Sequence, residues 1–145
     1  MTLEHLFDAE LQYREGMPPL TADGEGELIG SGDGIARGER LAGSLRWTLF
    51  EQPGELVCQM NPILEIATGD GGEVRVEGRG YAKREHAGDQ LWRVAATLRF
   101  DSDDARYAWL TGRLGVWEGE FDAEAHRAHY HAFLTPDPTV PRTAG

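Results

Sequence analysis

The sequence predicts a single, mainly β domain: an antiparallel up-and-down β-barrel of the calycin or lipocalin type, with one short helix near residues 102–110. Three observations support this prediction. Apolar residues recur at every second position in several runs, which is the period of a strand and not of a helix. Glycine-rich loops separate these runs. The 145 residues, of which 40% are hydrophobic, lie in the usual range for one domain with one core.

Three runs, at residues 91–100, 41–49 and 73–81, show the alternation most clearly. In each run one face is apolar, and most side chains of the other face are polar or charged, which is typical of a half-buried strand. The apolar faces comprise Trp92, Val94, Ala96, Leu98 and Phe100 in the first run, Leu41, Gly43, Leu45, Trp47 and Leu49 in the second, and Val74, Val76, Gly78 and Gly80 in the third.

The loops between the runs have sequences typical of tight turns. Residues 69–72 read Gly-Asp-Gly-Gly between the runs 62–68 and 73–81, and glycine adopts the positive φ angles that a hairpin turn needs. Residues 51–54 and 85–89 separate their neighbouring runs in the same way. Consecutive strands joined by short loops indicate a meander, and its closure into a barrel leaves no exposed edge.

The last third of the chain holds the expected helix and the last strand. Ser102 is a candidate N-cap for a helix over residues 102–110, because Asp103 and Asp104 follow it and suit the helix dipole. Residues 122–125 are predicted as a turn and 126–134 as the final strand. Residues 135–145 are rich in proline and predicted as a tail, so the barrel domain spans residues 1–134.

The net charge, the cysteine content and the N-terminal sequence limit the expected partners, disulfides and location of the protein. The net charge of −11 repels phosphate backbones and anionic lipid, which disfavours nucleic acids and membranes as partners. Cys58 is the only cysteine, so no internal disulfide forms, and it is expected in the core. The first residues lack the pattern of a signal peptide, and no apolar run approaches the ~18 residues of a membrane span. A cytoplasmic protein is therefore expected.

Several short segments together resemble a known family. Residues 32–43, residues 69–74 followed by Gly78 and Gly80, and residues 107–110 occur in the order and spacing of the bacterial family called domain of unknown function 3237. Residues 3–7 resemble that family's first strand. The resemblance covers residues 3–134 and implies a compact antiparallel barrel with no established catalytic set. Many members carry an acidic residue before the tryptophan of the second barrel strand, where this chain has Arg46.

Glu65 is the candidate catalytic residue, because it interrupts the apolar segment at residues 62–67. If its face lines the barrel, burial raises the pKa of the carboxyl group, which then suits a general acid or base. If Leu64 and Ile66 point inward instead, Glu65 lies on the surface. The alternation alone leaves both placements open.

Aromatic residues are the candidate ligand contacts. Trp47, Trp92, Trp109 and Tyr130 can form the wall of a pocket, although tryptophan in a domain of this size is more often part of the core. His129 and His131 share one face of the last strand, which is the spacing of a weak alternative metal site. The alternative for these histidines is an outer, solvated face, with Tyr130, Ala132 and Leu134 packed inside.

Several common motifs are absent or incomplete. The glycines of residues 30–34 do not match a phosphate-binding loop and are predicted as turn or bulge residues. The sequence contains no Ser-His-Asp order, H-E-x-x-H, P-loop or cysteine pair, so common hydrolase, kinase and redox classes lose support.

Three hypotheses of function follow. In the first, the protein is a small-molecule enzyme that acts in the barrel lumen on an apolar or aromatic substrate by cofactor-free acid/base chemistry of isomerase, cyclase or lyase type. In the second, it is a non-catalytic barrel that binds a small ligand. In the third, the barrel is packed solid and its outer face forms a structural homodimer. A carboxylate in the lumen favours catalysis, a lumen without titratable groups favours binding, and a filled interior favours the third hypothesis.

Overall fold

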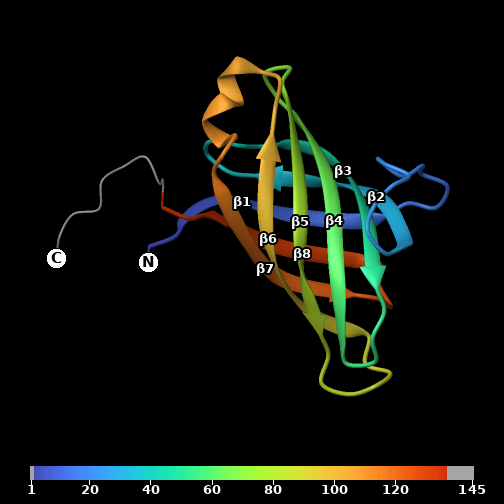
Figure 1. Cartoon of the computed structure of the whole chain (residues 1–145). Helices are drawn as coiled ribbons and strands as arrows, with labels where there is room; N and C mark the ends of the chain where they lie inside the picture. Colours follow the sequence, from blue (N-terminus) through green and yellow to red (C-terminus); the bar gives the residue numbers. More distant parts are fainter. Residues whose placement is uncertain (1, 137–145) are drawn as a thin grey trace.

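The computed structural model describes residues 2–136, which form a closed barrel of eight antiparallel strands (Figure 1). Each strand pairs with the next one in the chain, and β8 pairs with β1 to close the barrel. The elements are β1 (Glu4–Tyr13), β2 (Glu27–Arg37), β3 (Gly43–Gln52), β4 (Val57–Thr68), β5 (Glu73–Lys83), β6 (Leu91–Asp101), the 3-10 helix η1 (Ala105–Leu110), β7 (Leu114–Asp122) and β8 (Arg127–Leu134). The predicted up-and-down barrel with one short helix is confirmed.

Side chains alternate between the inside and the outside of the barrel as the sequence predicts. Most residues assigned to the apolar faces of β3, β5 and β6 are buried, and most of their neighbours are exposed. Trp92, at the start of β6, is only partly buried. Leu41 is fully buried but lies in the turn before β3, so the predicted strand begins two residues later.

Strand β4 differs from the prediction. The runs at residues 55–60 and 62–68 form one strand, and Pro62 lies within it. Proline lacks the backbone N–H that a ladder needs, so it is tolerated only where that bond is not required. The register shows this, because β4 pairs with β5 on both sides of Pro62 but not at Pro62 itself.

The glycines at residues 30–34 lie inside β2. The pairing of β2 with β3 shifts between Leu28 and Gly30, so a bulge is confirmed there and no turn is present. Gly32 is needed for a different reason. A Cβ atom at this position would lie 2.6 Å from Nε1 of Trp47, so the glycine makes room for the indole ring.

The helix is shorter than predicted and begins later. The N-cap of η1 is Asp104, whose carboxylate accepts a hydrogen bond from the backbone N–H of Arg106 at 2.9 Å. Ser102 lies before the helix: its hydroxyl donates to the backbone carbonyl of Glu73 and accepts from the backbone N–H of Asp104 at 3.2 Å. The last strand begins at Arg127, one residue later than predicted.

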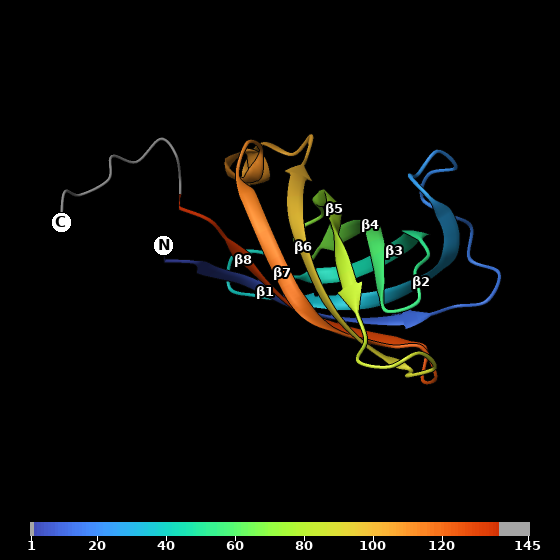
Figure 2. The same ribbon diagram turned by 60° about the horizontal axis from the view of Figure 1, so that its bottom comes forward.

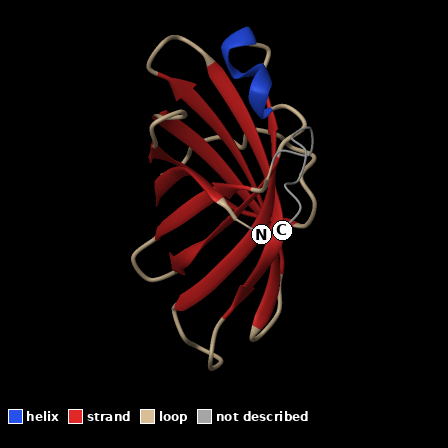
Figure 3. Cartoon of the chain, turned by 90° about the vertical axis from the view of Figure 1, so that its left-hand side faces the viewer, coloured by secondary structure: helices blue, strands red, loops and turns tan. Residues whose placement is uncertain are grey.

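The two ends of the barrel are closed differently. At one end, which we call the η1 end, η1 lies beyond the strands together with the turns at residues 38–42 and 69–72 (Figures 2 and 3). Leu41 and Leu110 are fully buried there and plug the interior. The opposite end carries the loops at residues 14–26, 53–56, 84–90 and 123–126. Except for Thr135 and Pro136, the predicted tail at residues 135–145 lies outside the described residues.

Candidate ligand-binding site

Two stacked aromatic rings lie in the interior of the barrel. Trp117 in β7 and Tyr130 in β8 have ring centroids 4.1 Å apart and planes 12° apart. Their side chains are 2% and 5% exposed. The strand pairing puts Ala132 opposite Trp117 and Gly119 opposite Tyr130, and these small residues leave space for the rings. The stack therefore follows from an alternation of large and small residues across two neighbouring strands.

A small cavity lies beside this stack, toward the end opposite η1. Its volume is about 20 Å³. The wall is almost entirely apolar and includes Trp47, Leu49, Met60, Val94, Trp117 and Tyr130. A buried water needs roughly 10–15 Å³, so the cavity as it stands holds about one water molecule.

The stacked rings carry two polar groups without partners. The indole Nε1–H of Trp117 is buried and has no hydrogen-bond partner. Within residues 2–136, the hydroxyl of Tyr130 makes no hydrogen bond either. Burial raises the pKa of Tyr130 well above its usual value of 10.0, so this hydroxyl stays protonated at neutral pH. The two rings that carry these neutral donors thus line a cavity with otherwise apolar surroundings.

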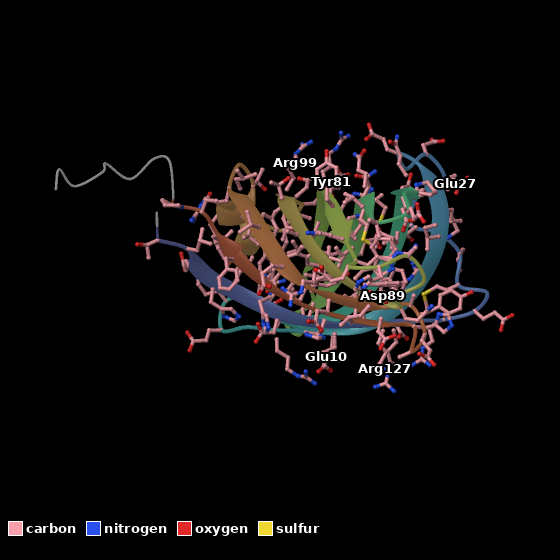
Figure 4. All side chains as sticks on the ribbon, turned by 90° about the horizontal axis from the view of Figure 1, so that it is seen from below. Glu10, Glu27, Tyr81, Asp89, Arg99 and Arg127 are labelled. Carbon is pink, nitrogen blue, oxygen red and sulfur yellow. The ribbon has the colours of Figure 1, made fainter. Side chains whose placement is uncertain are left out.

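The turn between β7 and β8 forms the rim of the cavity. His126 lines the cavity and has a φ angle of 54°, a conformation that residues other than glycine seldom adopt. Its backbone carbonyl accepts a hydrogen bond from the N–H of Tyr13 at 3.1 Å, and the two rings lie 5.5 Å apart. Arg127 also borders the cavity, but its side chain points away from the barrel on the same side as Glu10 (Figure 4).

Glu65 lies on the outside of the barrel. Leu64 and Ile66 are fully buried, so the alternation turns Glu65 outward. Its carboxylate lies 3.7 Å from Nη1 of Arg75 on β5, and Arg46 of β3 is its partner on the other side. The surface placement is therefore the correct one, and the interior position that the acid/base role of Glu65 required is wrong.

The four aromatic residues expected at a ligand site are divided between the two ends of the barrel. Trp47 and Tyr130 line the cavity. Trp92 does not, and its ring packs under the guanidinium of Arg84 at 4.5 Å. Trp109 belongs to η1, at the opposite end of the barrel, and the guanidinium of Arg40 lies 3.6 Å from its ring centroid.

Trp117 is the residue that the sequence-based site lacks. It was counted among the core tryptophans, and burial confirms that placement. Its position between Gly115 and Gly119 was the available signal, because glycines on the inner face of a strand mark a close approach of neighbouring groups, here Phe100 at Gly115 and the backbone of β8 at Gly119. The same residue is therefore both core and cavity wall.

The histidines of β8 lie on the outer face, while Tyr130, Ala132 and Leu134 are buried, as the solvated alternative predicts. The rings of His129 and His131 are 6.3 Å apart. Within residues 2–136, no three or more His, Cys, Asp or Glu side chains are arranged to hold a metal ion.

His131 instead joins a group that we call the Asp8 cluster: His5, Asp8 and His131. Nδ1 of His131 lies 2.7 Å from Oδ1 of Asp8, and Nε2 of His5 lies 2.8 Å from the same oxygen. These hydrogen bonds lower the pKa of Asp8, and the carboxylate raises the pKa of His131. A bulge between His5 and Phe7 puts His5 and Asp8 on one face, which strict alternation could not predict.

Cys58 is a core residue, as expected. Its side chain is buried, and burial beside Glu51 raises the pKa of the thiol to about 11. The thiolate is therefore scarce at neutral pH, and Cys58 is a poor nucleophile.

Comparison with solved structures identifies the fold. The chain superimposes on a β-barrel-like protein from Acinetobacter baumannii with a TM-score of 0.72 at 16% identity, over 92% of this chain and 94% of the other. A protein of unknown function from Clostridium acetobutylicum matches with a TM-score of 0.66 at 12% identity, over 94% and 100%. An enzyme from Penicillium herquei matches with a TM-score of 0.54 at 20% identity, over 91% and 93%. The likeness is one of fold.

Sequence comparison adds no family. No family model matches the chain, and no curated protein is significantly similar to it in sequence. Within the described residues, no helix has the length and apolar character needed to cross a membrane.

Proposed function

We propose that the protein binds a small, flat, mostly apolar molecule at the end of the barrel opposite η1. The observation that carries this proposal is the cavity beside the Trp117–Tyr130 stack. Aromatic walls with few polar groups are typical of small-molecule sites in barrels. At the η1 end, Leu41 and Leu110 are buried in the core, and the hollow beside residues 111–114 is lined mainly by charged and polar residues.

The size of the cavity implies that binding involves a rearrangement. A ring-sized ligand exceeds about 20 Å³, so side chains at the rim must move when it enters. Met60 can do so at low cost because its side chain is flexible and unbranched. His126 lies in an exposed turn, so its side chain can move while its backbone carbonyl keeps the hydrogen bond from the N–H of Tyr13. The ligand therefore opens its own site.

Binding is favoured over catalysis by the composition of the wall. No Asp or Glu side chain lines the cavity among residues 2–136. In the described part of the chain, the titratable groups that line it are Tyr130, whose raised pKa keeps it protonated, and the rim residues His126 and Arg127. By the criterion set from the sequence, this interior lacks the carboxylate expected of an acid/base enzyme.

A thermal-shift screen against flat aromatic compounds tests the proposal. A ligand present at about 100 times its Kd stabilises the native state by about 2.7 kcal/mol. For a domain of this size, we expect a rise in Tm of roughly 5 °C or more. Ala128→Val should weaken binding of any such compound at least about tenfold, because the added methyl groups occupy the cavity.

Ala95→Val is the matched control, because Ala95 is exposed on the outer face of β6. This variant should bind the ligand as the wild type does. Equal affinity in the Ala128→Val variant, with its fold confirmed by Tm, would place the ligand elsewhere. A screen without any stabilising compound would favour the third hypothesis, that of a packed barrel with a structural role.

The second candidate function is catalysis in the same cavity, without Glu65. The observation that favours it is the pair formed by Tyr130 and His126, since a neutral donor and an imidazole can share proton transfer to and from one substrate. The chemistry would be cofactor-free isomerisation, cyclisation or elimination. Product analysis of each compound that binds distinguishes the two functions, and loss of turnover with retained binding in His126→Gln would support catalysis.

We also propose that the chain belongs to the family called domain of unknown function 3237. The order of the glycine-rich segments and the antiparallel barrel support this membership. Assembly into a homodimer through the outer face is part of the same proposal, and the mass of the protein in solution measures it.

A further inference from the structure

We infer that the ligand of this cavity is a neutral molecule that offers a hydrogen-bond acceptor, a carbonyl or ether oxygen, to Trp117 and Tyr130. This inference rests on the proposed function and adds the chemical class of the ligand. It starts from the indole N–H of Trp117, which is buried without a protein partner, and from the neighbouring hydroxyl of Tyr130, which makes no hydrogen bond within the described residues.

Trp117 fixes the direction of the missing hydrogen bond. The indole nitrogen is a donor only, so nothing but an acceptor can satisfy it. A buried donor without an acceptor is costly, and native proteins rarely leave one unpaired. By contrast, Trp47, which lines the same cavity, donates from Nε1 to the backbone carbonyls of Gln12 and Asp33, both at 3.1 Å. The two tryptophans of this wall therefore differ: the indole N–H of Trp47 has acceptors, and that of Trp117 has none among the described residues.

The hydroxyl of Tyr130 is a second donor for which a ligand could provide the acceptor. Its hydroxyl remains protonated, and the described residues provide no acceptor for it. The two rings are stacked nearly parallel, so one flat molecule can lie beside both. A ligand with an oxygen at its edge would pair with at least one of these donors while its ring contacts the apolar wall.

The surroundings disfavour a charged ligand. Burying an ion in an apolar site is costly unless a counter-ion lies beside it. Arg127, the rim cation, directs its side chain away from the barrel (Figure 4). The carboxylates of Glu10, Glu120 and Asp122 border the outer groove that Arg127 also lines. The interior wall therefore favours a neutral molecule over an acid or an amine.

One water molecule is the competing occupant. The cavity has space for about one water, which would lie beside the two rings that carry the donors. If water satisfied these groups permanently, an acceptor on the ligand would bring no advantage. The experiment must therefore compare ligands that differ in the acceptor alone.

The test uses 1-indanone, indane and 1-aminoindane, which share a flat bicyclic skeleton. Indanone carries a carbonyl acceptor, indane has no polar group, and aminoindane is a cation at neutral pH. Isothermal titration with the wild type should show indanone binding about 5- to 100-fold more tightly than indane, because only indanone satisfies a buried donor. Aminoindane should bind more weakly than both.

Tyr130→Phe keeps the aromatic ring and removes the donor, and Trp117→Phe replaces the indole with a smaller aromatic ring that has no donor. Each variant should reduce the preference for indanone over indane, and the double variant should bring it close to one. Indane itself should bind the variants about as well as the wild type. Trp92→Phe is the control and should keep the full preference, because Trp92 lies outside the cavity wall. A melting curve of each variant confirms that it is folded.

The outcomes separate the two proposals. If indane and indanone bind equally to the wild type, water satisfies the donors and the inference fails, while the proposed function stands. If the preference persists in both single variants and in the double variant, the acceptor binds elsewhere and the inference fails as well. If neither compound nor any larger flat molecule binds, the proposed function itself fails.

Discussion

Asp8 accepts hydrogen bonds from two imidazoles at a single carboxylate oxygen, and this arrangement makes the stability of the barrel depend on pH. The Asp8 cluster joins β1 to β8, the pair of strands that closes the barrel. The pKa of Asp8 is lowered by its hydrogen bonds to His131 and His5, and the pKa of His131 is raised by its hydrogen bond to Asp8. All three side chains are about half exposed, so the effect is modest.

The pKa shifts of Asp8 and His131 define the pH range in which the Asp8 cluster stabilises the barrel. Asp8, with a lowered pKa, contributes stability above its unfolded value of 3.8, and this contribution is lost as the pH falls through the folded pKa. His131, with a raised pKa, contributes fully below its unfolded value of 6.5 and loses the contribution as the pH rises through the folded pKa. Asp8→Asn should therefore lower Tm most between pH 3.8 and 6.5, by at most roughly 3 °C.

Melting curves of the wild type and Asp8→Asn from pH 3 to 9 measure this difference. His129→Gln is the control, because His129 lies on the same face without a hydrogen bond to a carboxylate in the described residues. A constant difference between the wild type and Asp8→Asn across the whole range would show that the cluster does not titrate in this way.

Single positions also show where sequence reasoning succeeds and where it stops. Trp47 and Tyr130 are buried inside the barrel because alternation alone decides which face they occupy, whereas their role as ligand contacts stays a prediction. The acid/base role of Glu65 required its side chain to point into the barrel. Both faces of this segment are mostly apolar, so the sequence could not decide which face is inside, and the structure shows that Leu64 and Ile66 are buried. His5 and Asp8 meet through a bulge, which changes the phase without a strong signal in the sequence.

Two glycines of strand β5 lie where neighbouring groups pack closely inside the barrel. Gly78 and Gly80 occupy inward positions of β5, and their neighbours fill the space that side chains would take. A Cβ at Gly78 would lie 2.7 Å from Cγ of Pro62. A Cβ at Gly80 would lie 2.4 Å from the Cα of Ala96, so neither position has room to spare.

Gly80→Ala should accordingly destabilise the barrel by about 1–3 kcal/mol, since the added methyl group overpacks the contact between β5 and β6. Urea denaturation measures the free energy of unfolding directly. The reason is steric and lies in the backbone of β6, so repacking of a single flexible side chain cannot relieve it.

Gly69→Ala is the matched control for this substitution. Gly69 lies in the turn between β4 and β5, a Cβ there meets no atom within 4 Å, and its φ angle is not positive. This variant should change the free energy of unfolding by no more than about 0.5 kcal/mol. Equal losses in the two variants would show that strand glycines have no special packing role here.

The strands were predicted more reliably than the helix and the loops. Period-two alternation and tight turns determine β3, β5 and β6 nearly to their ends. The helix depends on a few polar contacts: Asp104 caps η1, while the hydroxyl of Ser102 donates to Glu73 and accepts from the N–H of Asp104. The hydrogen bond to Glu73 depends on the position of a strand 29 residues away in the chain, which local sequence does not encode.

The closed barrel itself could be predicted because each strand pairs with its sequence neighbour, so only the contact between β1 and β8 is distant in the chain. The shape of the interior could not be predicted from the sequence. Whether a barrel encloses a large lumen or a small cavity depends on how Leu41, Leu110 and the glycines of β5 pack together. The resulting cavity is confined to one end, and the proposed function depends on that asymmetry.

The four tryptophans report on both ends of the molecule. Trp47 and Trp117 line the cavity, Trp92 packs against Arg84, and Trp109 belongs to η1. Indole N–H resonances in a ¹H–¹⁵N spectrum, assigned by four Trp→Phe variants, therefore show where a ligand binds. On titration with a compound from the thermal-shift screen, the resonance of Trp117 should move most, that of Trp47 should follow, and that of Trp109 should stay in place. A shift of Trp109 with Trp117 unmoved would contradict binding at the aromatic cavity.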